Sequence, residues 1–394
     1  MISYKQALSL INKNCSTLPS VRTNLNAASG QMLAVDVFST MNFPSFAQSA
    51  MDGYAVRFSD LKKNSTLKII GEVPAGDVFD GRLQPGEAIR IFTGAAVPAG
   101  ADTVVIQEKT VRNWNELTVT TPPSAKGANI RKTGSQTKAG EKVLAKNSLL
   151  TPAAVGLLSG IGCHHISVFP KPRVGILATG KELVVQGNTL KPGQIYESNS
   201  YALSAALRQL HIEHIPVMMA TDDEEKIIAA ILELLEQSDV LLITGGVSVG
   251  DYDFVSGALK KISVQKIFHG VKQKPGKPLY FGKLSQKYIF GLPGNPGSVL
   301  TCFYFYVQQA IALLQNKPLQ ELQNFSLGQM IKKKKGLTHF IKAKMKSGKA
   351  ISLSGQESYK MNAFAVADAL IVLPENEEKF LKGKPVKVLP LLHD

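Results

Sequence analysis

Cysteine and aromatic residues are scarce in this sequence of 394 residues. It has a single tryptophan and three cysteines, Cys15, Cys163 and Cys302, which lie far apart and form no CxxC pair. This spacing excludes a disulfide framework and a zinc ribbon, and it is typical of a protein kept in a reducing compartment. We therefore expect a cytoplasmic protein.

Long hydrophobic runs are also missing. No apolar run approaches the roughly 20 residues that a membrane span needs, and the opening MISYKQALSLINKN lacks the apolar stretch and cleavage site of a signal peptide. Hydrophobic residues still make up 44% of the chain. The sequence therefore predicts a globular protein with two to four domains of ~100–200 residues each and no membrane partner.

Acidic residues are outnumbered by basic ones, 30 to 45, for a formal net charge of +15. Much of the excess lies near the end of the chain, where the stretch IKKKKGLTHFIKAKMKSGK has no arginine and one aromatic residue, Phe340. A nucleic-acid site usually adds arginines and stacking aromatic residues, whereas lysines on exposed strands protect the edges of sheets. We expect no nucleic-acid partner but a general attraction for small anionic ligands.

The middle of the chain alternates between short apolar runs and helical patterns. The predicted strands are 173–179, 215–220, 240–246, 264–270 and a hairpin over 279–294, and the predicted helices are 198–210, 221–237, 253–262 and 295–315. Strands that alternate with helices of this length predict a mostly parallel sheet with helices on both faces. We place this α/β domain at residues 169–318.

The regions on either side are richer in short β-forming runs and turns. We expect a β-rich inserted domain at 25–142, a small helical linker domain made of 1–24 and 143–168, and a C-terminal domain like a β-barrel at 319–394. The predicted fold class is therefore multidomain α/β plus β.

One loop of the α/β domain, TGGVSVGDYDF at 244–254, combines glycines with carboxylates. The backbone N–H groups of Gly245 and Gly246 and the hydroxyl of Ser248 suit a phosphate. Asp251 is read as a helix cap. Asp253 falls in the first turn of the following helix, where it can hold the divalent cation that accompanies a phosphate.

Three further loops follow strands of the same sheet. TGKEL carries Glu182 and lacks the spacing of a P-loop. KPGKP carries Lys274 and Lys277 between prolines that stiffen the chain and so favour an oxyanion site. GLPGNPGS offers Asn295 as helix cap, Pro296 at the first helical position and Ser298 nearby. Because ligands of open α/β sheets bind at the carboxyl ends of the strands, we expect these loops to meet.

Two motifs of the β-rich region add polar side chains. SAMDGYAVR places Asp52 in a turn before Gly53, and IFTGAAVPAGAD places Thr93 at a strand end. Neither motif predicts a function by itself.

Nine motifs in order resemble those of the molybdopterin molybdenumtransferase family, which includes MoeA and the corresponding domain of gephyrin. They are SAMDGYAVR, IFTGAAVPAGAD, NIRKTG, TGKEL, LKPGQIYESNSY, TGGVSVGDYDF, KPGKPLYFG, GLPGNPGSV and ALIVLPE, and they run from residue 49 to residue 375. The resemblance implies an enzyme that inserts molybdate into adenylylated molybdopterin, with Mg²⁺-dependent release of AMP. It also implies a homodimer whose active site is shared between the subunits.

The resemblance assigns roles to individual residues. Asp52, Thr93, Glu182 and Asp253 would be catalytic, with Glu182 and Asp253 as ligands of Mg²⁺. The residues implied to bind molybdate, molybdopterin or AMP are Gly245, Gly246, Ser248, Lys274, Lys277, Pro293, Gly294, Asn295, Pro296, Ser298 and Lys342. Lysines and a hydroxyl at a helix N-terminus are suited to molybdate, a doubly charged tetrahedral oxyanion.

Some positions depart from the family's pattern. Gln136 stands where the family has an aspartate, and Lys342 stands for an arginine, which keeps the charge but loses the bidentate fork. Asn362 and Ala363 replace a pair of serines. These four residues bear on the affinity for molybdate.

Two other functions fit parts of the pattern. An adenylyltransferase that acts on molybdopterin would share the α/β domain, but the flanking β domains and KPGKP count against it. A protein that binds and carries the cofactor, or a scaffold, would be consistent with the departures, although no linker that would serve a scaffold is visible.

Overall fold

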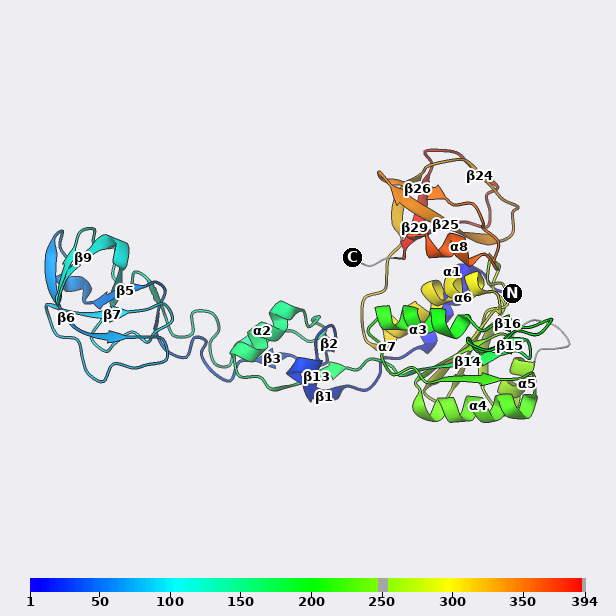
Figure 1. Ribbon diagram of the computed structural model, residues 1–394, viewed down its shortest axis with the longest axis horizontal. Coiled ribbons are helices and arrows are strands. Elements are labelled where there is room, and N and C mark those ends of the chain that lie inside the picture. Colours follow the sequence, from blue (N-terminus) through cyan, green and yellow to red (C-terminus); the bar gives the residue numbers. More distant parts are fainter. Residues whose placement is uncertain (247–253, 392–394) are drawn as a thin grey trace. The chain divides into compact units, whose positions relative to one another are not determined.

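The computed structural model describes residues 1–246 and 254–391. The chain divides into two units, one formed by Met1–Val21 with Phe169–Asp394 and the other by Arg22–Val168 (Figure 1). We describe each unit by itself.

The first unit is built around a six-stranded sheet. Its order is β17 (Val217–Ala220), β14 (Val174–Thr179), β18 (Val240–Thr244), β22 (Lys287–Leu292), β21 (Tyr280–Leu284) and β19 (Gln265–His269). The first four strands are parallel, and β21 is antiparallel to both of its neighbours. This arrangement confirms the predicted mostly parallel sheet and the hairpin at its end.

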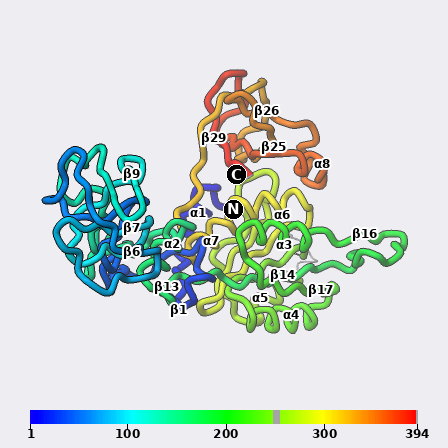
Figure 2. Tube along the Cα trace, turned by 60° about the vertical axis from the view of Figure 1, so that its left-hand side comes forward, coloured from blue at the N-terminus to red at the C-terminus, as the bar shows by residue number. Residues whose placement is uncertain are grey.

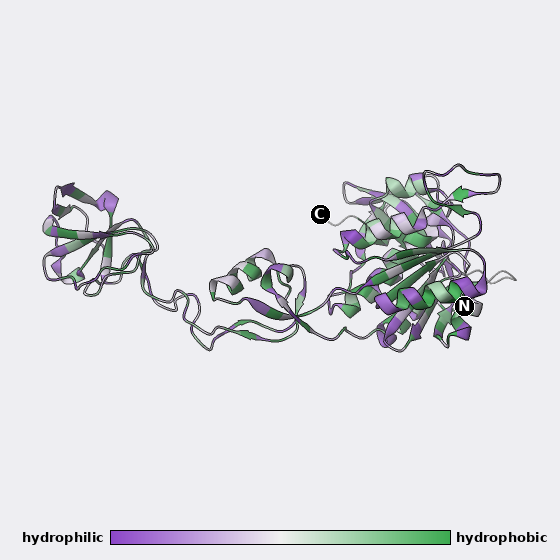
Figure 3. Ribbon diagram, turned by 60° about the horizontal axis from the view of Figure 1, so that its bottom comes forward, coloured by the Kyte–Doolittle hydropathy of each residue, from purple (hydrophilic) through white to green (hydrophobic). Residues whose placement is uncertain are grey.

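Helices cover both faces of this sheet (Figure 1). Side chains alternate along the strands, so that Leu241 and Ile243 pack with α4 (Glu224–Gln237) and α5 (Phe254–Lys261), while Leu242 packs in the opposite core. That second core holds α3 (Asn199–Gln209) and the final helical run, made of α6 (Pro296–Cys302), η4 (Phe303–Val307) and α7 (Gln308–Leu314). In Figure 3 the central strands are mostly green, the colour of hydrophobic residues.

The final helical run, Pro296–Leu314, has 19 residues and is apolar enough to cross a membrane by length and composition alone. The expectation that no apolar run approaches this length is therefore wrong. The most apolar window of this run is 72% buried inside the unit. Core burial accounts for this composition, because a helix that is apolar all round packs on several sides.

The N-terminal helix lies in a different place from the one expected. We grouped residues 1–24 with 143–168, but α1 (Tyr4–Asn14) packs in the core of the α/β sheet through Tyr4, Ala7 and Ile11. The Tyr4 ring meets the Phe305 ring edge-on with centroids 5.7 Å apart. The spacing of its apolar residues gives α1 one hydrophobic stripe, and the final helix supplies the surface that covers it.

A closed barrel follows the α/β sheet. The strands β25 (Thr338–Lys346), β26 (Lys349–Ser352), β23 (Gln323–Leu327), β29 (Pro385–Pro390) and β27 (Ala369–Leu373) form a ring that the β25–β27 pairing closes. The prediction of a C-terminal domain like a β-barrel is thereby confirmed. A short strand, β20 (Gln273–Lys274), pairs with β25 and ties the KPGKP loop to the barrel.

Two small elements complete this unit near the carboxyl ends of the parallel strands. The strands β15 (Leu183–Val184) and β16 (Ile195–Tyr196) form a pair that projects from the unit (Figure 2). The helix α8 (Met361–Ala365) precedes β27.

The second unit is mostly β structure, as predicted. Its larger sheet has the order β8 (Thr103–Ile106), β5 (Gly53–Val56), β7 (Glu87–Ile91), β6 (Ser65–Val73), β10 (Glu116–Val119) and β9 (Thr110–Asn113). A separate core joins α2 (Pro152–Gly160) to β1 (Val21–Asn24), β13 (His165–Phe169) and β2 (Met32–Leu33). Shorter strand pairs, β11 (Ile130–Arg131) with β4 (Gln48–Ser49) and β12 (Lys142–Leu144) with β3 (Val37–Phe38), and isolated β-bridges connect the remaining segments.

Candidate active site

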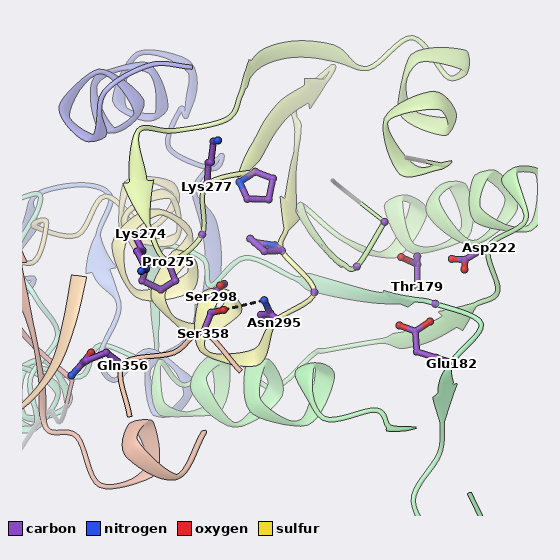
Figure 4. A pocket seen from close by; sticks show the side chains of 17 residues that line it. Thr179, Glu182, Asp222, Lys274, Pro275, Lys277, Asn295, Ser298, Gln356 and Ser358 are labelled. Atoms are coloured by element: carbon purple, nitrogen blue, oxygen red, sulfur yellow. Dashed lines mark hydrogen bonds between the residues drawn. The ribbon is translucent and has the colours of Figure 1, made fainter. Parts of the chain in front are cut away.

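A cavity of about 560 Å³ lies at the carboxyl ends of β14, β18 and β22. The loops after these strands line it together with the KPGKP loop and a segment of the barrel. Figure 4 shows Lys274 and Lys277 on one side of the cavity and Glu182 and Asp222 on the other. The full lining is Thr179, Gly180, Glu182, Asp222, Gly245, Gly246, Lys274, Pro275, Gly276, Lys277, Pro278, Pro293, Gly294, Asn295, Ser298, Gln356 and Ser358.

A buried side-chain amide fixes the conformation of the loop that carries the two lysines. Gln273, directly before the two lysines, is 1% exposed. Its Nε2 donates to the Gly276 carbonyl at 3.0 Å, and its Oε1 accepts from the Tyr306 hydroxyl. The Val271 N–H also donates to the Lys277 carbonyl at 2.9 Å. The turn is therefore fixed from inside the core, while the Lys274 and Lys277 side chains remain exposed.

The start of α6 forms the floor between the two sides. Pro296 occupies the first helical position and Asn295 the cap position, as predicted, but the Asn295 side chain makes no bond to the helix. Its Nδ2 donates instead to Ser358 Oγ at 3.0 Å. Ser298 is buried one turn along. Pro296 has no N–H, and the N–H groups of Gly297 and Ser298 donate to the carbonyls of Ser358 and Asn295. The donor that this floor offers to an anion is therefore the Ser298 hydroxyl.

The acidic side is formed where β14 and β18 end. Thr179 Oγ1 donates to the Thr244 carbonyl at 3.2 Å, which holds the ends of the two strands together. The Lys181 N–H donates to Asp222 Oδ2 at 3.3 Å. Glu182 and Asp222 thus approach the cavity from neighbouring strand ends.

The acidic side fits a magnesium ion that also binds substrate. Among residues 1–246 and 254–391, no three His, Cys, Asp or Glu side chains gather into a metal site. Mg²⁺ is commonly bound by one or two carboxylates together with substrate phosphates. Glu182 and Asp222 can supply such a pair.

Three residues of the TGGVSVGDYDF loop, Ser248, Asp251 and Asp253, lie outside the described residues. Their neighbours Gly245 and Gly246 line the cavity. The predicted roles of Ser248 and Asp253 therefore stay predictions.

A second cavity of about 520 Å³ adjoins the first and shares Thr179, Glu182, Gly245, Gly294 and Asn295 with it. Pro296 lines this second cavity, together with side chains of β15, β16 and the start of α3. All binding residues predicted from the α/β domain that the structure describes therefore line one or both cavities.

Asp52 and Thr93 meet in the second unit. The backbone N–H and the hydroxyl of Thr93 both donate to Asp52 Oδ1, at 2.7 and 2.8 Å. These two hydrogen bonds, helped by the charge of Arg90, lower the pKa of the Asp52 carboxyl. Asp52 is therefore a carboxylate at neutral pH.

Lys342 does not line either cavity. Its side chain is 4% exposed, and its ammonium donates to the carbonyls of Glu357 and Lys360, both at 3.1 Å. Burial lowers the pKa of Lys342, and the Glu357 carboxylate opposes that effect. The structure thus places this lysine behind the cavity wall.

None of the other departures is among the residues that line the two cavities. Ala363 is buried in α8, and its N–H donates to the Asn362 side chain at 2.9 Å. Gln136 is exposed in the second unit, where its N–H donates to the Phe43 carbonyl at 3.0 Å.

Four polar side chains that line the first cavity were not predicted from the sequence: Thr179, Asp222, Gln356 and Ser358. Asp222 stands next to the helix cap Asp223, within the stretch 221–237 that the sequence predicts to be a helix. Gln356 and Ser358 come from the barrel, and nothing in their sequence shows that this segment reaches the α/β sheet. Of these four residues, only Thr179 could have been proposed from the sequence, because it lies at the end of a predicted strand.

Fold and cavity define a class: a multidomain protein whose α/β domain binds a ligand at the carboxyl ends of its strands. The MoeA N-terminal region (domain I and II) matches residues 2–162, a probable molybdopterin binding domain matches 175–313, and the MoeA C-terminal region (domain IV) matches 325–391. The chain belongs to the MoeA family of molybdopterin molybdenumtransferases.

Relatives match over almost the full length. A molybdopterin molybdenumtransferase of Haemophilus influenzae is 36% identical over 378 residues, which covers 94% of this chain and 93% of that protein. One from Staphylococcus epidermidis is 34% identical over 400 residues and covers 98% and 95%. The crystal structure of a molybdopterin biosynthesis MoeA protein from Pyrococcus horikosii superposes on all of both chains with a TM-score of 0.83 and 30% identity.

Proposed function

We propose that this chain is a molybdopterin molybdenumtransferase that inserts molybdate into adenylylated molybdopterin, releases AMP and forms molybdenum cofactor. The observation that supports this most is the cavity itself, with lysines on one side and carboxylates on the other. An oxyanion and a phosphoanhydride with its metal ion need both kinds of group in one place. The names of the relatives that match over almost the full length support the transfer of molybdenum to molybdopterin.

Lys274, Lys277 and Ser298 bind the molybdate. The exposed ammonium groups meet a dianion without a large cost of desolvation, and charge-assisted hydrogen bonds are the stronger kind. Because the Gln273 amide fixes the turn between the lysines, little conformational entropy is lost when the oxyanion arrives.

Glu182 and Asp253 would hold Mg²⁺, and Asp222 is a further carboxylate that lines the same cavity as Glu182. When bound, the ion would neutralise the charge that develops on the phosphate as the phosphoanhydride is cleaved. Gly245 and Gly246 allow the phosphate to approach the backbone at the same edge of the sheet.

The proposal includes a cytoplasmic homodimer in which Asp52 and Thr93 of one chain act at the cavity of the other. The two Thr93 hydrogen bonds support a functional use of Asp52, since they keep its carboxylate charged and in one orientation on the surface of the β unit. A light-scattering mass near the 42.5 kDa of one chain would contradict this part. A mixture of Asp52→Asn and Lys277→Met chains, each impaired alone at low molybdate, is expected to regain activity after subunit exchange.

The transferase reaction is tested with purified protein, adenylylated molybdopterin, molybdate and Mg²⁺, with AMP release followed over time. We expect AMP release that requires molybdate. No AMP at saturating molybdate would contradict the transferase and favour a protein that binds and carries the cofactor. Asp253→Asn is expected to abolish AMP release while the substrate still binds, and near-normal turnover would limit Asp253 to a helix cap.

A further inference from the structure

Arg90 of β7 lies next to the turn that carries Asp52 in the second unit. β7 pairs with β5, which begins directly after Asp52, and Tyr54 of β5 stands opposite Arg90 (Figure 1). The guanidinium carbon of Arg90 lies 5.1 Å from the centre of the Tyr54 ring and 4.9 Å from that of the Phe92 ring. A guanidinium is attracted to the face of an aromatic ring. Two rings therefore hold the Arg90 side chain in place.

The Arg90 guanidinium joins two segments of the chain that meet at this turn. Its Nη1 donates to the Gly53 carbonyl at 3.2 Å, and its Nη2 donates to Gln107 Oε1 at 2.6 Å. The backbone N–H of Gln107 donates in turn to the Asp52 carbonyl at 3.1 Å. Arg90 therefore fixes the backbone after Asp52 directly and the backbone of Asp52 itself through Gln107.

The side chain of Asp52 is held by the same stretch of chain. Thr93, three residues after Arg90, donates its backbone N–H and its hydroxyl to Asp52 Oδ1. Arg90 and Thr93 thus bind the backbone and the side chain of one turn. A change at Arg90 is therefore expected to move the Asp52 carboxylate.

The charge of Arg90 is not used in an ion pair. Within the part of the chain that the structure describes, its guanidinium lies within ion-pair distance of no carboxylate. Its hydrogen-bond acceptors are the neutral oxygens of Gly53 and Gln107. A bidentate ion pair would occupy both oxygens of a carboxylate. Asp52 instead remains exposed, with a positive charge nearby that does not cover it.

We propose that Arg90 is a positioning residue for Asp52: its guanidinium fixes the turn that presents the carboxylate, and its charge keeps that carboxylate ionised without binding it. The inference rests on the proposed function, in which Asp52 of one chain acts at the cavity of the other. The fork of the guanidinium is needed because its two acceptors lie on separate segments. The charge is needed because a neutral carboxyl group would not act as Asp52 does.

Arg90→Met tests the proposal by kinetics. We expect kcat for AMP release to fall about 10–100-fold, the effect of a displaced catalytic group. The KM for molybdate should not change, because Lys274, Lys277 and Ser298 belong to the other unit. Arg112→Met is the matched control, since Arg112 is an exposed arginine of the same sheet whose Nε donates to the Trp114 carbonyl at 3.0 Å. Equal kcat values for the two variants would overturn the proposal.

Titration of the Asp52 carboxyl by NMR gives a second readout, which needs no substrate. The hydrogen bonds from Thr93, and after them the charge of Arg90, lower the pKa of this carboxyl. Arg90→Met should therefore raise the pKa of Asp52 and move the acid limb of the kcat profile to higher pH. The signal is assigned by its loss in Asp52→Asn. A pKa of Asp52 that is the same in Arg90→Met and wild type would contradict the role of the charge.

Arg90→Lys separates the charge from the fork. A lysine keeps the positive charge but has no planar fork to reach both acceptors. The pKa of Asp52 should therefore stay at its wild-type value while kcat falls as in Arg90→Met. A wild-type kcat in Arg90→Lys would refute the bridging role of the guanidinium.

A double-mutant cycle shows whether Arg90 acts through Asp52. The Asp52→Asn, Arg90→Met double variant should be no slower than Asp52→Asn alone, whereas losses that multiply would give Arg90 an independent role and overturn the proposal. If Arg90→Met does not fold, Arg90→Lys takes its place in the cycle. Wild-type protein that releases no AMP would refute the transferase itself. An active wild type that loses activity in Asp52→Asn but not in the Arg90 variants would refute the role of Arg90 alone.

Discussion

Gly245→Ala is expected to damage both the cavity and the sheet beneath it. Gly245 has a φ of +85°, and an added Cβ would lie 2.3 Å from the Thr179 carbonyl oxygen, where real contacts are no shorter than 3.0 Å. A shift of at least the 0.7 Å between these values is needed at the ends of β14 and β18, close to Glu182, which follows β14 and lines the cavity.

The loss of stability in Gly245→Ala has two contributions, the strained backbone and the close contact. Left-handed backbone costs a residue with a side chain roughly 1–2 kcal/mol, and overpacking adds about 1–3 kcal/mol. A displacement of about 1 Å in a catalytic site can lower the rate about a hundredfold. Gly383→Ala separates the two terms, because Gly383 has the same φ of +85° and no atom within 4 Å of its added Cβ.

The assay compares the two variants side by side. We expect Gly245→Ala to lower kcat/KM for AMP release about a hundredfold and to speed hydrogen exchange at the amides of β14 and β18, whereas Gly383→Ala keeps wild-type kinetics. If kcat/KM of Gly245→Ala stays within twofold of that of Gly383→Ala, the reasoning from this contact is refuted.

Three further predictions follow from the same structure. Lys277→Met should raise the KM for molybdate about 10–100-fold, with the exposed neighbour Lys272→Met as control; equal values for both variants would exclude Lys277 from the oxyanion site. Burial, with the nearby charges of Lys333 and Lys274, lowers the pKa of His339 from 6.5 to about 4, so the unfolded chain takes up its proton at a higher pH than the folded chain. The free energy of unfolding should therefore fall by about 1–2 kcal/mol between pH 6.5 and 4, after allowance for solvent screening. Urea midpoints measured across this pH range should show the loss in the wild type and not in His339→Gln. The same dependence of the midpoint on pH in the variant would contradict this prediction. Asp52→Asn should lower kcat at least about a hundredfold with thermal stability retained, and full activity would remove Asp52 from the site.

The α/β sheet could be predicted from sequence because its information is local. Runs such as VLLITGG alternate with helices of the right length, and the loops after such strands meet at one edge of any parallel sheet. This logic brought Glu182, Lys274, Lys277 and Ser298 to one cavity, where the structure finds them.

The contribution of the barrel could not be predicted, because it depends on contacts between distant segments. Ser358 reaches the cavity through Gly297 and Asn295, some 60 positions away along the chain. The role of Lys342 also could not be predicted from the sequence. The sequence specifies a positive charge on a strand, but only packing shows that the charge is used on two backbone carbonyls.

The stoichiometry of the reaction tests the central claim most directly. Limiting molybdate is added to the protein with excess adenylylated molybdopterin and Mg²⁺, and both AMP and molybdenum bound to molybdopterin are measured. We predict equal amounts of the two products and no AMP before molybdate is added. AMP released without molybdate, or molybdenum bound to molybdopterin without AMP, would contradict the account.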